Sequence, residues 1–333
     1  MKNGAAGITK AETTRVSLLK RFFLQSYSSA VVACVLLAIL FSVTTTSFLS
    51  SFNLFNLSRT IASYGFIAAA QLMVAVIGGM NLSVGAVGAL ATVVSGILMQ
   101  NLGLPTAIVM LLTVAVGALC GLANGFLITK LKLAPFIITL AMSFVYDGLA
   151  MGVSHGYSYA INEDFTALGR GRMLGTSTLF VLLIALVLVL VVVFRYTRFG
   201  RNVLAVGGNA NAARLSGIKV DGVTIACNML SCALAALAAM LWTSKAGTAS
   251  PTTGADWMLY SFAVCAIGGI SLSGGNFTAI GFFCGACILT MVRNGLTMVH
   301  VDIYFEEAFL GAVILIAVSL ESLRSRMARN VAL

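Results

Sequence analysis

The chain has 333 residues, of which 59% are hydrophobic and only 9% charged, with a formal net charge of +10. A soluble domain carries roughly 25% charged residues, so this composition excludes a soluble protein. Long apolar runs with only 3 prolines predict an all-α polytopic membrane protein and exclude a barrel of alternating strands. Basic residues of membrane proteins gather in cytoplasmic loops and set the topology, so the positive charge is explained without nucleic acid and we expect no nucleic-acid partner.

Ten stretches approach the roughly 20-residue length that a helix needs to cross a bilayer. A polar, basic tail of residues 1–29 precedes the first stretch, which is too long for the apolar core of a cleaved signal peptide. A second tail, 321–333, follows the last one. The predicted spans are 30–49, 61–79, 82–102, 105–129, 133–153, 174–194, 223–243, 257–272, 277–296 and 303–320.

The charge distribution predicts the orientation of these spans. With both termini in the cytoplasm, most of the 20 Lys and Arg residues lie inside, as the positive-inside rule requires. Glycines at every fourth position in 117–125 and 281–285 indicate helix faces that pack closely. The cations predicted on the exterior side are Arg59, Arg170, Arg172, Lys245 and Arg293.

Two polar loops interrupt the apolar sequence. The loop 195–222 is predicted to be cytoplasmic, and its centre, GGNANAARLSGI, is rich in small residues. We interpret it as a short helix offered to a partner outside the membrane. The loop 154–173 is the longest on the predicted exterior side and mixes aromatic with charged residues.

An internal repeat of the form I-G-G-x-x-L-S-x-G occurs at 77–85 and 267–275. Both copies follow an even-numbered span, which indicates a duplication with both halves in the same orientation. The glycines can end one helix, and an Asn or Ser oxygen can cap the next. The residues of these two predicted cytoplasmic hairpin turns are Gly78, Gly79, Asn81, Ser83, Gly85, Gly268, Gly269, Ser271, Ser273, Gly274 and Gly275.

The sequence contains no motif for catalysis. Its two histidines, His155 and His300, stand in no nucleophile–base arrangement, and no phosphate-binding loop, HExxH or paired C-x-x-C spacing occurs. The seven cysteines lie in apolar segments and are interpreted as packing residues. We therefore expect no enzyme, no metal site and no cofactor bound by this chain. Asp147 is the one clear intramembrane acid, so it is a possible pathway residue, and an ion-gradient-driven secondary transporter using Asp147 remains an alternative.

Three motifs carry a resemblance to a known family. GGMNLSVGAVGALA, AVGGNANAARLSGI and AIGGISLSGGNF resemble, in this order, motifs of the permease subunits of bacterial ATP-driven monosaccharide importers of the ribose-permease type. The resemblance covers nearly the whole chain. It implies a permease domain at 30–320 in the inner membrane, a homo- or heterodimer of permease subunits, and a solute-binding protein that meets the loop 154–173. It also implies that ATP and Mg are bound by a partner ATPase. A permease for nucleosides or sugar derivatives is the alternative within this family.

The same resemblance identifies 195–222 as the loop that contacts the ATPase. Small side chains on one helix face would allow close approach, and Gly217 would let the chain turn away. The sequence departs from the family at Asn81, where Asp is usual. The residues that the resemblance places in this coupling loop are Gly207, Gly208, Asn209, Ala212, Ala213, Arg214, Ser216 and Gly217.

Overall fold

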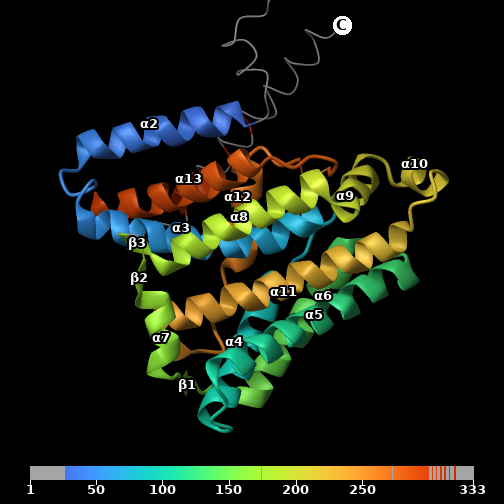
Figure 1. The fold of residues 1–333 in the computed structure, drawn as a ribbon, viewed down its shortest axis with the longest axis horizontal. Coiled ribbons are helices and arrows are strands. Elements are labelled where there is room, and N and C mark those ends of the chain that lie inside the picture. Colours follow the sequence, from blue (N-terminus) through green and yellow to red (C-terminus); the bar gives the residue numbers. More distant parts are fainter. Residues whose placement is uncertain are drawn as a thin grey trace, which may run out of the picture.

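The computed structural model describes residues 27–299, apart from 174 and 272, together with scattered positions between 302 and 319. Within this part the chain is almost entirely helical, which confirms the predicted class (Figure 1). The principal helices are α2 (Ser28–Thr44), α3 (Ser51–Ala75), α4 (Val84–Gln100), α5 (Thr106–Leu131), α6 (Pro135–Ser154), α8 (Thr178–Tyr196), α11 (Val220–Ala246), α12 (Trp257–Ile267) and α13 (Ala279–Met298).

Each of the first nine predicted spans overlaps one of these helices. The tenth, 303–320, and the tails 1–29 and 321–333 fall largely or wholly outside the described residues. Three predicted boundaries differ by five residues or more from the structure. α2 ends at Thr44 instead of 49. α3 begins at Ser51 instead of 61, because the Ser50 hydroxyl accepts a hydrogen bond from Asn53 N and caps the helix there. α12 ends at Ile267, five residues before the predicted end at 272.

Among the described helices, α5, α6, α8, α11 and α13 are long and apolar enough to cross a membrane, and α2, α4 and α12 are shorter apolar helices.

Both polar loops contain regular structure, although the sequence predicts a short helix only for 195–222. The loop 154–173 contains the helix α7 (Glu163–Arg170), and the loop 195–222 folds into α9 (Arg198–Gly208) and α10 (Ala210–Leu215). Four two-residue strands form two small antiparallel sheets. These pair β1 (Tyr159–Ala160) with β4 (Thr248–Ala249), and β2 (Arg172–Met173) with β3 (Thr176–Ser177).

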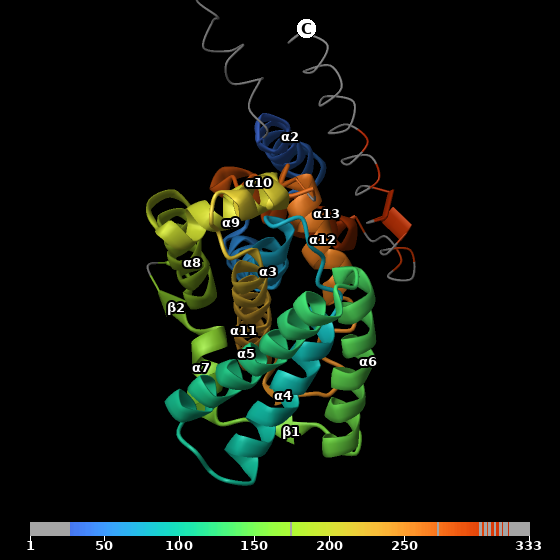
Figure 2. The same ribbon diagram turned by 90° about the vertical axis from the view of Figure 1, so that its right-hand side faces the viewer.

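α3 is the central helix of the bundle. It is buried almost without interruption from Ile61 to Ala75, and it packs against α8, α11, α12 and α13 (Figures 1 and 2). α5 packs along α11 through the predicted glycine face. A Cβ added at Gly117 would lie 2.6 Å from Cys232 O, and one added at Gly125 would lie 2.7 Å from Ile225 Cα. Only glycine therefore permits this helix contact.

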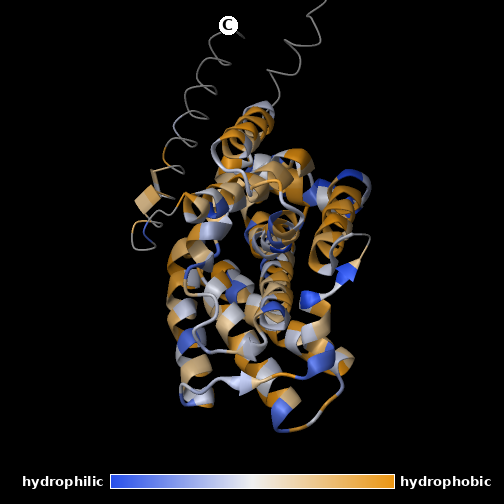
Figure 3. Cartoon of the chain, turned by 90° about the vertical axis from the view of Figure 1, so that its left-hand side faces the viewer, coloured by the Kyte–Doolittle hydropathy of each residue, from blue (hydrophilic) through white to orange (hydrophobic). Residues whose placement is uncertain are grey.

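Hydrophobic residues make up most of the length of the helices, and hydrophilic residues lie mainly near helix ends and in the connections (Figure 3). Val43 and Leu111, for example, are 81% and 72% exposed, which suits contact with lipid tails. The cations predicted on the exterior side lie near one another at one end, where Lys245 Nζ donates to Thr60 Oγ1 and Arg170 Nη2 donates to Ala246 O. α9 and α10 lie at the opposite end of α11 (Figure 1).

Candidate functional site

The three motifs that carry the resemblance meet at one point. Gly207, near the end of α9, lies between Val76 and Gly275, and Gly275 N donates a hydrogen bond of 2.8 Å to Val76 O. A Cβ added at Gly207 would collide with Val76 O and lie 2.5 Å from Gly275 N. The backbones touch because no side chain separates them. We call this contact the glycine junction, formed by Gly78, Gly207, Gly208, Gly274 and Gly275.

Both repeats end their helices with the same hydrogen-bond pattern, shifted by one residue. After α3, Gly79 N donates to Val74 O and Gly78 N to Ala75 O. After α12, Ile270 N donates to Cys265 O and Gly269 N to Ala266 O. This is the Schellman pair of bonds, and it requires a left-handed residue at the turn. Gly78 (φ 74°) and Gly269 (φ 70°) supply it, so the predicted helix-ending role of the glycines is seen at both repeats.

In the second half of each repeat, a side-chain oxygen accepts a hydrogen bond from the backbone N–H two residues later. The Asn81 amide oxygen accepts hydrogen bonds from Ser83 N (3.0 Å) and Ser83 Oγ (2.7 Å). The Ser271 hydroxyl likewise accepts from Ser273 N at 3.3 Å. The first repeat leads directly into α4 at Val84, whereas α13 begins only at Ala279.

The first repeat extends from the junction into the interior of the bundle. We call residues 78–85 the link segment. Gly78 touches Ser273 O at its junction end, whereas Gly85, at the other end, lies against Gly254. Asn81 and Ser83 are fully buried. Non-helical backbone at this depth needs internal hydrogen bonds, since lipid supplies none.

A network of buried polar side chains anchors the link segment. Leu82 N donates to Thr139 Oγ1 of α6, and Asn124 Nδ2 of α5 donates to Ser83 Oγ at 2.8 Å. Tyr146 OH of α6 then donates to the Asn124 carbonyl oxygen at 3.0 Å. The network holds α5 and α6 to one short stretch of backbone.

The structure gives a physical reason for Asn81. Its amide nitrogen donates to Ser231 Oγ of α11 at 2.9 Å while its oxygen accepts from Ser83. A carboxylate at this position would accept hydrogen bonds but could not donate to Ser231. Because a serine hydroxyl can also donate, an aspartate here would require the Ser231 hydroxyl to turn and donate to it.

The coupling loop presents a small helix to solvent. The Asn209 side chain caps α10 by accepting from Asn211 N and Ala212 N, both at 3.0 Å, and Gly217 (φ 84°) reverses the chain. Of the predicted residues, Ala213 is buried, whereas Ala212, Arg214 and Ser216 are exposed.

Sequence reasoning missed Leu215, which is 91% exposed at the end of α10. A large apolar side chain left in water within a polar loop is unfavourable unless another surface covers it. Its position inside the ARLSG motif was the available signal.

Asp147 does not lie near the junction. It is exposed on α6, beside Phe144, which is 71% exposed. On the same helix, a Cβ added at Gly148 or Gly152 would meet nothing within 4 Å. A pathway role for Asp147 remains a prediction, and it requires a path along this outer face of α6.

These features together define a class of protein. The described residues form a polytopic helical bundle in which three backbone segments meet at the glycine junction. The chain belongs to the family described as branched-chain amino acid transport system / permease component, which matches residues 53–318. No solved structure matches it.

Individual relatives narrow this description. The chain is 38% identical to the ribose import permease protein of Bacillus subtilis over 294 residues, 87% of this chain and 91% of that one. It is 34% identical to the galactose/methyl galactoside import permease protein of Escherichia coli (88% and 93% covered), and 32% identical to the fructose import permease protein of Rhizobium meliloti (82% and 79% covered). The resemblance read from the motifs is confirmed. The chain is a transport subunit of the bacterial inner membrane and not an enzyme.

Proposed function

We propose that this chain forms the membrane path of an ATP-driven monosaccharide importer. The family description names branched-chain amino acids, but all the relatives described above are import permeases for sugars, and they cover most of this chain. ATP and Mg are bound by a separate ATPase subunit in this proposal. A second permease subunit completes the path, and a solute-binding protein contacts the loop 154–173.

The observation that carries the proposal is the glycine junction. α9 and α10 lie outside the bundle, yet Gly207 touches the backbone of Val76 at the end of α3 and of Gly275 before α13. A rigid displacement of the loop must therefore move both repeats, because no side chain between them can change rotamer and absorb it.

The link segment carries this displacement inward. Its buried hydrogen bonds join it to α5, α6 and α11. Closure of the ATPase subunits would thus reach α5 and α6 through the link segment, whereas α11 also packs directly against α9 and α10. Two discrete arrangements of this packed unit would alternate access to the path.

Docking of the ATPase is assigned to the exposed face of α10. Ala212 permits close approach, and Leu215 supplies a large apolar side chain whose burial against the partner would be favourable.

The first test replaces this anchor. We expect Leu215→Glu to abolish co-purification with the ATPase subunit and ATP-driven uptake, because a carboxylate would be desolvated in the partner's groove. Leu102→Glu is the matched control. Leu102 is 63% exposed and follows α4 at the predicted exterior side, so that variant should retain association. Full association and uptake with Leu215→Glu would contradict the assignment.

A further inference from the structure

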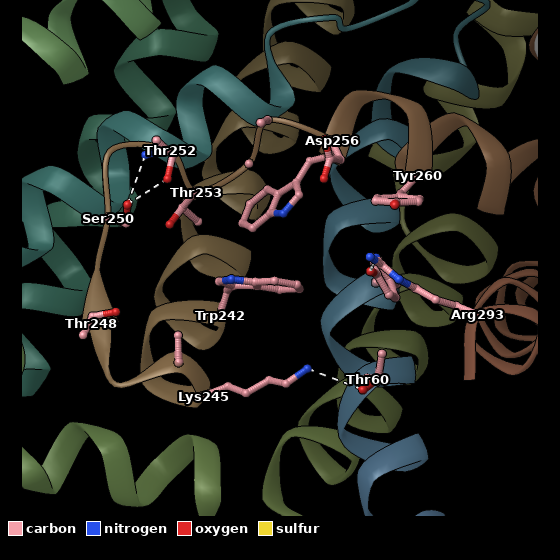
Figure 4. Close-up of a pocket in the computed structure, with 15 residues that line it drawn as sticks. Thr60, Trp242, Lys245, Thr248, Ser250, Thr252, Thr253, Asp256, Tyr260 and Arg293 are labelled. Carbon is pink, nitrogen blue, oxygen red and sulfur yellow. Dashed lines mark hydrogen bonds between the residues drawn. The ribbon is translucent and has the colours of Figure 1, made fainter. Parts of the chain in front are cut away.

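A cavity of about 520 Å³ lies among α3, α11, α12 and α13, away from the glycine junction (Figure 4). Its volume is in the range of small-molecule sites, roughly 300–1,000 Å³. Its lining residues lie far apart in the sequence, at 60–64, 242–260 and 293. The connection 248–257 between α11 and α12 forms one wall. Both tryptophans of the chain, Trp242 and Trp257, line it.

Four aromatic rings form a continuous chain along the cavity. Tyr260 and Tyr64 have ring centroids 5.0 Å apart, Tyr64 and Trp242 6.2 Å, and Trp242 and Trp257 5.8 Å. All three pairs are edge-to-face, an arrangement that stabilises ring orientation. Tyr64, Trp257 and Tyr260 are each 3% exposed, so the wall is rigidly packed.

Charged and hydroxyl groups surround the same space. Lys245 Nζ lies 5.1 Å from the Trp242 ring centroid and donates to Thr60 Oγ1 at 3.4 Å. Arg293 from α13 donates to Tyr64 OH, and its guanidinium lies 5.3 Å from the Tyr260 ring. Asp256 is exposed at the edge, so the cavity offers both donors and an acceptor.

The cavity is in contact with the parts of the chain that we assign to transport. Its wall residue Gly254 lies against Gly85 of the link segment, and a Cβ added at Gly88 of α4 would lie 2.6 Å from the Trp257 ring. On the other side, β4 pairs with β1 of the exterior loop. The cavity thus lies between the loop predicted to meet the solute-binding protein and the link segment.

We propose that this cavity is a binding subsite for a neutral monosaccharide within the permease itself. A sugar ring has an apolar C–H face suited to an aromatic wall, and each hydroxyl both donates and accepts hydrogen bonds. Lys245, Arg293 and Asp256 supply complementary groups within one cavity. This inference rests on the proposed function and adds to it a place where the sugar pauses inside the bundle.

The chain provides its own reporter for the test. Because both tryptophans line the cavity, intrinsic tryptophan fluorescence of the purified full-length permease reports on this site alone. The purified permease, in lipid nanodiscs and without its partners, is titrated with D-ribose, D-galactose and D-fructose. D-galacturonate and L-isoleucine are titrated in parallel. We expect a saturable change with at least one of the three neutral sugars and none with the other two compounds.

Two variants inside the cavity and one control outside it test whether the fluorescence change comes from binding at this subsite. Lys245→Met and Asp256→Asn should each raise the sugar concentration at half-saturation about tenfold, because a hydrogen bond to a charged group is lost. Lys130→Met is the matched control. Lys130 also lies over an aromatic ring, 5.9 Å from the Phe126 centroid, but outside the cavity, so its titration should equal that of the wild type. Asp256 is exposed, so its variant tests the subsite without disturbing the core.

The outcomes are distinct. The absence of a saturable response to any neutral sugar, a response confined to galacturonate or isoleucine, or equal titrations for all variants would overturn the subsite. The proposed function would still stand if ATP-driven sugar uptake persisted in that case. Loss of ATP-driven uptake of every sugar by the wild-type complex would instead reject the proposed function, whatever the fluorescence shows.

Discussion

The glycine junction and the aromatic cavity are built from opposite kinds of residue. At the junction, five glycines bring three backbone segments into contact. In the cavity, two tryptophans, two tyrosines and three charged side chains line about 520 Å³. Direct backbone contact transmits a displacement, whereas large side chains around an opening provide room and hydrogen-bonding groups for a solute. Within the proposed function, the glycine junction therefore transmits movement and the aromatic cavity binds the sugar.

The link segment joins these regions through eight residues. Gly78 belongs to the junction, and Gly85 lies against Gly254 of the cavity wall. Between them, Asn81 and Ser83 fix the segment to the surrounding helices. The comparison therefore predicts that substitutions in the junction uncouple ATP hydrolysis from uptake. Substitutions in the cavity should instead change the sugar concentration at which uptake is half-maximal.

The largest effect is expected at Gly207. In Gly207→Ala the new methyl group would collide with Val76 O, so the junction must open and uptake should fall to background. The neighbouring Gly208→Ala is the control, because a Cβ there meets nothing within 4 Å. Uptake and ATPase activity are measured in reconstituted vesicles. Equal uptake by the two variants would show that close backbone contact at Gly207 is not required.

Much of the junction could be predicted from the sequence, because each of its three segments is a contiguous motif. Glycine pairs ending a hydrophobic run indicate a helix end, and the charge bias places 77–85, 195–222 and 267–275 on one side of the membrane. The depth of Asn81 and Ser83 could not be predicted. Whether a turn lies at the surface or inside a bundle depends on neighbouring helices that a local pattern does not contain.

The aromatic cavity could not be predicted at all. Its main residues lie near 60, 242–257 and 293, and none belongs to a recognisable motif. Trp242 and Tyr260 each resemble an ordinary core aromatic in sequence, and only the packing of four helices brings them together. Leu215 was missed for a different reason, since its exposure becomes evident only once α10 is placed outside the bundle.

A smaller effect, on stability, is expected at Asn124. Asn124→Leu removes the donor to Ser83 Oγ and one of the two acceptors within reach of Tyr146 OH, the other being Cys120 O, which should cost about 1–3 kcal/mol. Asn228→Leu is the control, because Asn228 is also buried but only its nitrogen is bonded, to Thr224 O. Thermal unfolding in detergent should therefore give a lower Tm for the Asn124 variant. The reverse order would mean that the network does not anchor the link segment.

The smallest effect is expected at the salt bridge of the coupling loop. Arg214 Nη2 lies 3.2 Å from Asp221 Oδ1, with the side chains 66% and 68% exposed, and such pairs contribute about 0–1 kcal/mol. Asp221→Asn should therefore leave both the Tm and ATPase co-purification within error of the wild type at physiological salt. If the pair instead positioned α10, association would weaken in this variant, and high salt would weaken it in the wild type. That result would mean that surface charge, and not the backbone contact at Gly207 and the Asn209 cap, holds α10 in position. Close backbone contact would then no longer explain how the junction transmits a displacement.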